Sequence, residues 1–119
     1  MNITPVQERT VWVEVKPRRY PVIIHPGGLS SLGHILAQHI KPHRSFIVTD
    51  SNVGPLYAEP AVASLRQAGF EVTVFTIEAG EGSKSMTTVG RIYDAMARAG
   101  IDRACPAISL GGGVVGDLT

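Results

Sequence analysis

The sequence has one cysteine, almost no net charge and no long apolar run, and each of these shortages argues against a class of protein or site. Among its 119 residues there is one cysteine, Cys105, so neither an intrachain disulfide nor a cysteine-based metal site is expected, and a small buried apolar role suits this residue. The net charge of +1 gives no reason to expect a nucleic-acid or membrane partner. The first ten residues lack the apolar core of a signal peptide, and no apolar run approaches the ~20 residues that a bilayer requires. We therefore expect a cytoplasmic protein.

What is present suits one α/β domain. A hydrophobic content of 44% can fill a core, and the length is enough for one compact domain but not for two. Two short β-type runs, 11–15 and 20–25, flank a turn that contains a proline, and this pattern predicts an antiparallel hairpin. Apolar residues at helical spacing then predict a helix from Ser30 or Ser31 to about Ile40.

The rest of the chain alternates strands with helices. Short apolar runs predict strands over 45–50, 70–77 and 105–110. Helical spacing, with a glycine after each segment, predicts helices over 60–68, beginning at Pro60, and over 87–99. This alternation is typical of a parallel sheet with right-handed crossovers. The expected fold is a Rossmann-like parallel-sheet half-domain preceded by an N-terminal antiparallel hairpin.

The last residues, 114–119, are typical of the first turn of a helix that the chain does not complete. A helix of one turn is not stable by itself. We therefore expect residues 1–119 to be a fragment of a longer protein.

Polar or glycine-rich segments follow each of the three predicted parallel strands. They are residues 50–52, 79–84 and 111–117. Ligands in open α/β sheets bind beyond the carboxyl ends of the strands, so the fold would bring these segments to one edge. Their convergence indicates a ligand site.

The segment 111–116 has the pattern G-x-G-x-x-G between a strand and a helix. Glycine lets the backbone approach a pyrophosphate closely, and the free N–H groups at a helix start can bind its oxygens. A tight turn without a ligand is the alternative. The acidic ribose ligand that usually follows ~20 residues later would lie beyond residue 119.

Five polar residues near these segments each have two interpretations. Glu81 can accept hydrogen bonds from ribose hydroxyls and Lys84 can donate to hydroxyl or phosphate oxygens, or the two form an exposed ion pair that caps the next helix. Asp50 and Asn52 either border a ligand or cap a helix. Asp117 either interacts with a helix dipole or faces the ligand.

The four histidines all lie in the first 43 residues. His39 and His43 have i,i+4 spacing, but Pro42 ends the helix that would align them. No metal ligand is therefore expected in the chain, and no serine–histidine–aspartate or paired-carboxylate catalytic group can be assembled.

Together these motifs resemble the 3-dehydroquinate synthase family. The likeness covers essentially the whole chain and is carried by residues 19–24, 48–53, 56–57, 79–81, 84–85 and 110–119. It implies that Gly80, Glu81 and Lys84 contact the adenosine side of NAD and that Asp50 and Asn52 border the adenine pocket. It also implies that Gly112, Gly113, Val114, Val115, Gly116 and Asp117 line the pyrophosphate and nicotinamide end.

The resemblance further implies an activity. Members of the family convert 3-deoxy-D-arabino-heptulosonate 7-phosphate to 3-dehydroquinate and phosphate in the shikimate route to aromatic amino acids, with NAD and a divalent zinc or cobalt ion. The metal ligands and a helical second domain would lie beyond residue 119. The 119 residues alone are thus expected to be inactive, to bind NAD weakly and not to bind the metal.

Other readings stay open. A sibling sugar-phosphate cyclase and an iron- or zinc-dependent polyol dehydrogenase would each carry a glycine-rich turn. A stand-alone nucleotide-binding module that is naturally this short is the third alternative. An exposed apolar face and an unpaired sheet edge would favour a homodimer or other self-association.

Overall fold

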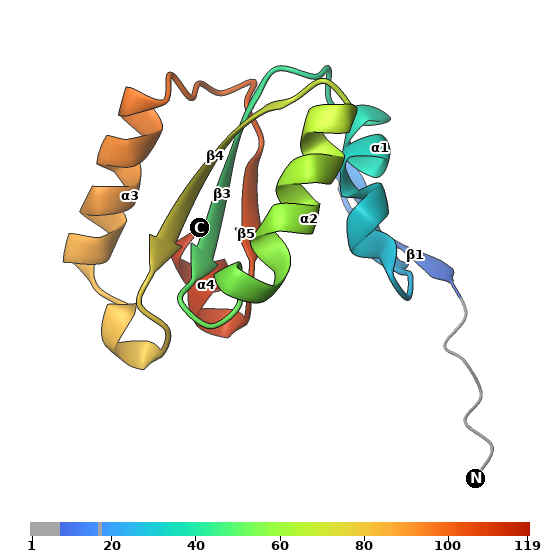
Figure 1. The fold of residues 1–119 in the computed structure, drawn as a ribbon. Coiled ribbons are helices and arrows are strands. Elements are labelled where there is room, and N and C mark those ends of the chain that lie inside the picture. Colours follow the sequence, from blue (N-terminus) through green and yellow to red (C-terminus); the bar gives the residue numbers. More distant parts are fainter. Residues whose placement is uncertain (1–7, 17) are drawn as a thin grey trace, which may run out of the picture.

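An antiparallel hairpin begins the part of the chain that the computed structural model describes, which comprises residues 8–16 and 18–119 (Figure 1). Its strands are β1 (Arg9–Val15) and β2 (Arg18–Ile24), and they form a two-stranded sheet of their own. The hairpin prediction is confirmed. Pro17, the proline expected between the two strands, and residues 1–7 lie outside the described residues.

A parallel three-stranded sheet forms the centre of the molecule. Its strands are β3 (Arg44–Asp50), β4 (Glu71–Ile77) and β5 (Ala107–Leu110), in the order β4-β3-β5. In the register, Val48 of β3 lies between Phe75 of β4 and Ser109 of β5. The predicted α/β fold with a parallel sheet is therefore confirmed.

Helices cover both faces of this sheet (Figure 1). They are η1 (Gly28–Ser31), α1 (Leu32–Ala37), α2 (Gly54–Gln67), η2 (Glu81–Ser83), α3 (Met86–Arg98) and α4 (Gly113–Leu118). Along β3, Ile47 packs with α1 and α2, whereas Phe46 and Val48 pack with α3 and α4. This two-sided burial explains why β3 is a continuous apolar run, since all three side chains are fully buried.

The strand order creates a topological switch point. The chain moves from β3 outward to β4 through α2, and then returns past β3 through α3 to place β5 on the other side. The connections that leave β3 and β4 therefore run in opposite directions along the sheet. In open α/β sheets, a crevice for a ligand forms outside the carboxyl ends of the strands at such a point.

Helix α2 differs from its prediction. It is one helix from Gly54 to Gln67 with Pro60 inside it, so the prediction that Pro60 begins the helix is wrong. A proline in a helix removes a hydrogen bond to the carbonyl four residues earlier, here that of Leu56. Leu56 and Pro60 are both exposed, so water can hydrogen-bond to that carbonyl. The proline at the start of the helix is Pro55, in the first turn, where proline is favoured.

Cys105 also differs from its prediction. It is half-buried and precedes β5, which begins at Ala107, so it is not a buried residue of the strand. Its thiol is hydrogen-bonded to Asp102 in the turn that leads into β5. Among the described residues, no helix is long and apolar enough to cross a membrane.

Helices α1 and α2 are held together at one glycine, which gives a stability test. The Gly33 N–H donates to Ser64 Oγ at 2.9 Å, and a Cβ atom on Gly33 would overlap the Ser64 carbonyl oxygen. We expect Gly33→Ala to lower the free energy of unfolding by about 1–3 kcal/mol, the usual cost of overpacking. Urea denaturation measures this change.

Gly90 supplies the matched control. It also lies inside a helix, α3, but a Cβ atom added there meets nothing within 4 Å. Gly90→Ala should therefore raise the free energy of unfolding by about 0.8–1.0 kcal/mol through helix propensity. Equal effects of the two substitutions would contradict the described packing of α1 on α2.

Candidate functional site

The carboxyl edge of the sheet, where the loops leave β3, β4 and β5, is held together by hydrogen bonds between those loops. Buried Thr49 of β3 donates its hydroxyl to the Leu110 carbonyl at the end of β5, at 2.8 Å. After β3, the Ser51 N–H donates to the Ile77 carbonyl at 2.9 Å, and Ser51 Oγ accepts from the Ala79 N–H at 3.0 Å. The three segments that the sequence placed at one edge are thus joined there.

Asp50 organises the loop after β3. Its Oδ1 accepts two backbone hydrogen bonds, from the N–H of Asn52 at 2.9 Å and from that of Val53 at 2.7 Å. Its Oδ2 lies 3.6 Å from the position that a Cβ atom on Gly111 would take. Asp50 therefore caps the start of the loop to α2 and lies beside the glycine turn, whereas Asn52 is exposed.

The turn after β5 requires glycine at its first position. Gly111 has a φ of 157°, and a Cβ atom there would lie 2.9 Å from Cγ2 of Val115. The Val115 side chain is itself in the core, 1% exposed, against Phe46 and Val48. Val115 thus anchors α4 and turns its side chain away from the surface.

The next three glycines of the turn and helix leave open space beside the backbone. A Cβ atom on Gly112, Gly113 or Gly116 would meet no atom within 4 Å. Helix α4 begins at Gly113, and no side chain of the described residues caps it. The first N–H groups of a helix have no partner inside that helix, so they are directed outward at this edge. Val114 is half-buried beside them.

An ion pair joins the loop after β4 to α4. Lys84 Nζ and Asp117 Oδ2 lie 2.8 Å apart, although the residues are 33 positions apart in the sequence. The hydrogen bond from Lys84 to Asp117, the charge of Asp117 and the charge of Glu81 raise the pKa of Lys84 above its ordinary value of 10.5. Glu81 starts η2 after Gly80, whose φ of 105° suits glycine.

Helix α3 takes its cap from another residue. Ser85 Oγ accepts a hydrogen bond from the Thr88 N–H at 3.2 Å. Capping α3 therefore does not require Glu81 or Lys84. Lys84 is a cation at neutral pH, and its raised pKa preserves the charge to higher pH, which suits binding of an anion or a hydroxyl and not abstraction of a proton.

The site is an open surface built from backbone N–H groups, one ammonium and several carboxylates. Except for half-buried Asp50 and Val114 and buried Val115, all the residues singled out from the sequence are exposed. Sequence reasoning placed Ser51 at this edge but missed that its side chain bonds to the loop after β4, and it missed Thr49 altogether. The available signal was a run of polar residues at the end of an apolar strand.

The Lys84–Asp117 pair gives a test of this geometry. We expect the Lys84 ammonium to titrate above the pKa of an ordinary lysine and Asp117→Asn to move its pKa down toward 10.5. Since the pKa is raised in the folded state, any contribution of Lys84 to stability is present below pH 10.5 and is lost as the pH rises further. NMR titration of the lysine side chains measures this; Asp94→Asn, an exposed carboxylate on α3, is the control.

Known proteins are similar to this chain over nearly its whole length. A family model described as 3-dehydroquinate synthase N-terminal matches residues 74–119. The 3-dehydroquinate synthase of Symbiobacterium thermophilum is 42% identical over 107 residues, 89% of this chain and 30% of the relative. That of Rhizobium meliloti is 38% identical over 118 residues, 99% of this chain and 31% of the relative. The chain thus spans about 30% of the length of these relatives.

Solved structures of other proteins share the fold. A 2-deoxy-scyllo-inosose synthase matches with a TM-score of 0.79 at 18% identity, over 92% of this chain and 31% of the other. A 2-epi-5-epi-valiolone synthase from Streptomyces hygroscopicus, solved with NAD⁺ and Zn²⁺ bound, matches with a TM-score of 0.65 at 31% identity, over 99% of this chain and 30% of the other. By sequence and by fold, the chain is similar to the amino-terminal part of 3-dehydroquinate synthases.

Proposed function

We propose that the chain is the dinucleotide-binding part of a 3-dehydroquinate synthase and that it binds NAD at the carboxyl edge of the sheet. The observation that carries the proposal is the Lys84–Asp117 ion pair, because it joins the loop after β4 to α4, the helix that follows the glycine turn. A solved relative with NAD⁺ bound, 31% identical to this chain, also supports it.

The residues at this edge fit a dinucleotide. The open flanks of Gly112, Gly113 and Gly116 leave room for a pyrophosphate against the backbone, and the uncapped start of α4 offers N–H donors to its oxygens. Exposed Glu81 accepts hydrogen bonds from ribose hydroxyls, and Lys84 donates to hydroxyl or phosphate oxygens. When bound, NAD supplies an acceptor for a hydride of the substrate and later returns it.

The remaining residues position those groups. Asp50 keeps the loop over residues 51–53 beside the glycine turn, so that Asp50 and Asn52 border the adenine pocket. Val115 fixes α4 to the core, while Val114, next to it in the first turn, and Asp117 lie near the nicotinamide end. Lys84 exchanges part of its contact with Asp117 for the cofactor when the cofactor binds.

The proposed reaction of the whole enzyme converts 3-deoxy-D-arabino-heptulosonate 7-phosphate to 3-dehydroquinate and phosphate, a step of the shikimate pathway. Support comes from relatives of that name at 38–42% identity. A sibling sugar-phosphate cyclase is the second candidate, supported by the 31% identity to the valiolone synthase.

A divalent metal ion does not fit the carboxyl edge of this chain. Among the described residues, this edge carries no imidazole or thiol, and the carboxylate of Asp117 is paired with Lys84. We therefore assign the zinc or cobalt ion of the proposed reaction to ligands outside this chain.

The proposed setting is a cytoplasmic protein that associates with itself. The hairpin supports self-association because large apolar side chains are exposed on it: Val11, Trp12, Val15, Tyr20, Val22 and Ile24. A sugar phosphate is the proposed small-molecule partner.

NAD binding to the chain tests the cofactor proposal. In NMR titrations with NAD we expect the largest amide shifts at 80–84 and 111–117, and about tenfold weaker binding for Glu81→Ala because a charge-assisted hydrogen bond is lost. Glu14→Ala, an exposed carboxylate of the hairpin, should leave the affinity unchanged. Shifts confined to other surfaces would contradict the proposal.

Substrate choice tests the proposed reaction. The enzyme that contains this chain should release phosphate from 3-deoxy-D-arabino-heptulosonate 7-phosphate when NAD and zinc or cobalt are present, and much less from glucose 6-phosphate. The glucose compound is chosen because a related inosose synthase has been solved with its carba analogue. The reverse preference would favour the sibling cyclase.

A further inference from the structure

We propose that His43, Asp102 and Cys105 form a binding site for a zinc-type divalent cation at the amino edge of the parallel sheet, the end at which β3, β4 and β5 begin. One potential ligand atom from each residue lies within 4.8 Å of the other two. His43 directly precedes β3, and Asp102 and Cys105 lie in the turn before β5. This edge lies at the opposite end of the strands from the proposed dinucleotide edge.

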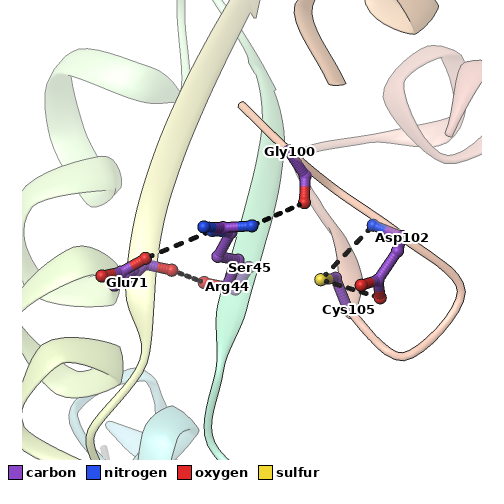
Figure 2. Close-up of polar contacts among 6 residues, drawn as sticks. All are labelled: Arg44, Ser45, Glu71, Gly100, Asp102 and Cys105. Carbon is purple, nitrogen blue, oxygen red and sulfur yellow. Dashed lines mark hydrogen bonds and ion pairs between the residues drawn. The ribbon is translucent and has the colours of Figure 1, made fainter. Parts of the chain in front are cut away.

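The turn before β5 holds a thiol and a carboxylate together (Figure 2). Cys105 Sγ donates to Asp102 Oδ1 at 3.3 Å, and the Ala104 N–H donates to the same oxygen at 2.8 Å. The Cys105 N–H also donates to the Asp102 carbonyl at 3.1 Å. These bonds preorganise two of the three ligands before any ion binds.

The third ligand is carried on a segment that is fastened to the same edge. The His43 carbonyl accepts a hydrogen bond from the Glu71 N–H at 2.9 Å. Next to it, Arg44 donates to the Gly100 carbonyl at 3.2 Å and pairs with Glu71 at 3.5 Å (Figure 2). The backbone of His43 is thereby tied both to β4 and to the chain that enters the Asp102 turn.

The donor types select the class of ion. Imidazole nitrogen, thiolate sulfur and carboxylate oxygen are zinc ligands, whereas Mg²⁺ and Ca²⁺ prefer oxygen donors alone. Zinc bond lengths of about 2.0–2.3 Å place tetrahedral ligand atoms about 3.3–3.8 Å apart. The thiol of Cys105 and the carboxylate of Asp102 already have that separation, and the His43 ligand atom lies within 4.8 Å of both, so closure requires the imidazole to move closer to them.

A cavity that His43 lines leaves room for a water molecule as a further ligand. Its volume is about 420 Å³, and it is lined by His39, Ile40, Lys41, Pro42, His43 and Ala104. Three protein ligands and an open position filled by water are the arrangement of many zinc sites. On binding, the Cys105 thiol loses its proton to solvent and the imidazole binds in its neutral form.

Zinc binding to the whole chain under reducing conditions tests the proposal. Calorimetry with ZnCl₂ should show one ion per chain, and MgCl₂ should show no binding. We expect zinc affinity to fall more than about tenfold in each of three variants, His43→Gln, Asp102→Asn and Cys105→Ser. The reason is that losing even a hydrogen-bond partner of a metal ligand typically lowers metal affinity about 10–100-fold. His34→Gln, an exposed histidine on α1, is the matched control and should bind zinc normally.

Cobalt supplies a second readout. Co²⁺ in the same site should give a thiolate charge-transfer band in the near ultraviolet that Cys105→Ser and Cys105→Ala both abolish. The zinc and cobalt measurements do not involve NAD, so their outcome is independent of the proposed function. All variants should show the same NAD-induced shifts at the carboxyl edge as the unmodified chain. Absence of saturable zinc binding, or unchanged affinity in folded His43 and Cys105 variants, would overturn the proposal.

Discussion

The buried strand β3 is the constraint on which the rest of the structure depends. It pairs with β4 on one side and β5 on the other, and its Phe46, Ile47 and Val48 side chains are fully buried. The apolar area on both of its faces is covered by different helices, which fixes β3 in the middle of the sheet. Every segment of the carboxyl edge is then positioned relative to the end of this one strand.

Polar atoms at the end of β3 hold together the loops of the carboxyl edge. Thr49 is buried and hydrogen-bonded to the last residue of β5, while Ser51 bonds to the loop after β4. Asp50 lies between them and holds its own loop. Binding costs less when the groups that contact the ligand are already in position. The hydrogen bonds of Thr49, Asp50 and Ser51 hold the loops of this edge in position before any ligand binds.

Much of this architecture could be predicted from the sequence. Short apolar runs identified the hairpin and the three parallel strands, and their alternation with helices identified the edge at which the loops meet. The strand order could not be predicted, because an apolar stripe on α3 does not say which face of the sheet it covers, and that face determines on which side β5 pairs. Pro60 was misjudged because a proline within a helix is tolerated where the freed carbonyl reaches water.

The cluster at the amino edge lay beyond sequence reasoning for a different reason. His43 and Cys105 are distant in the sequence, and the i,i+4 spacing of His39 and His43 suggested a pair that Pro42 prevents. Only the parallel pairing of β3 with β5 brings the imidazole to the Asp102 turn. Local patterns predict elements, whereas contacts between chain-distant loops depend on the order of the strands.

A crystal structure of the chain grown with NAD would test the central claim most directly. The account predicts the pyrophosphate against the backbone of Gly112 and Gly113, with the adenosine ribose at Glu81. Density for NAD at any other surface, with the carboxyl edge covered only by solvent, would contradict it.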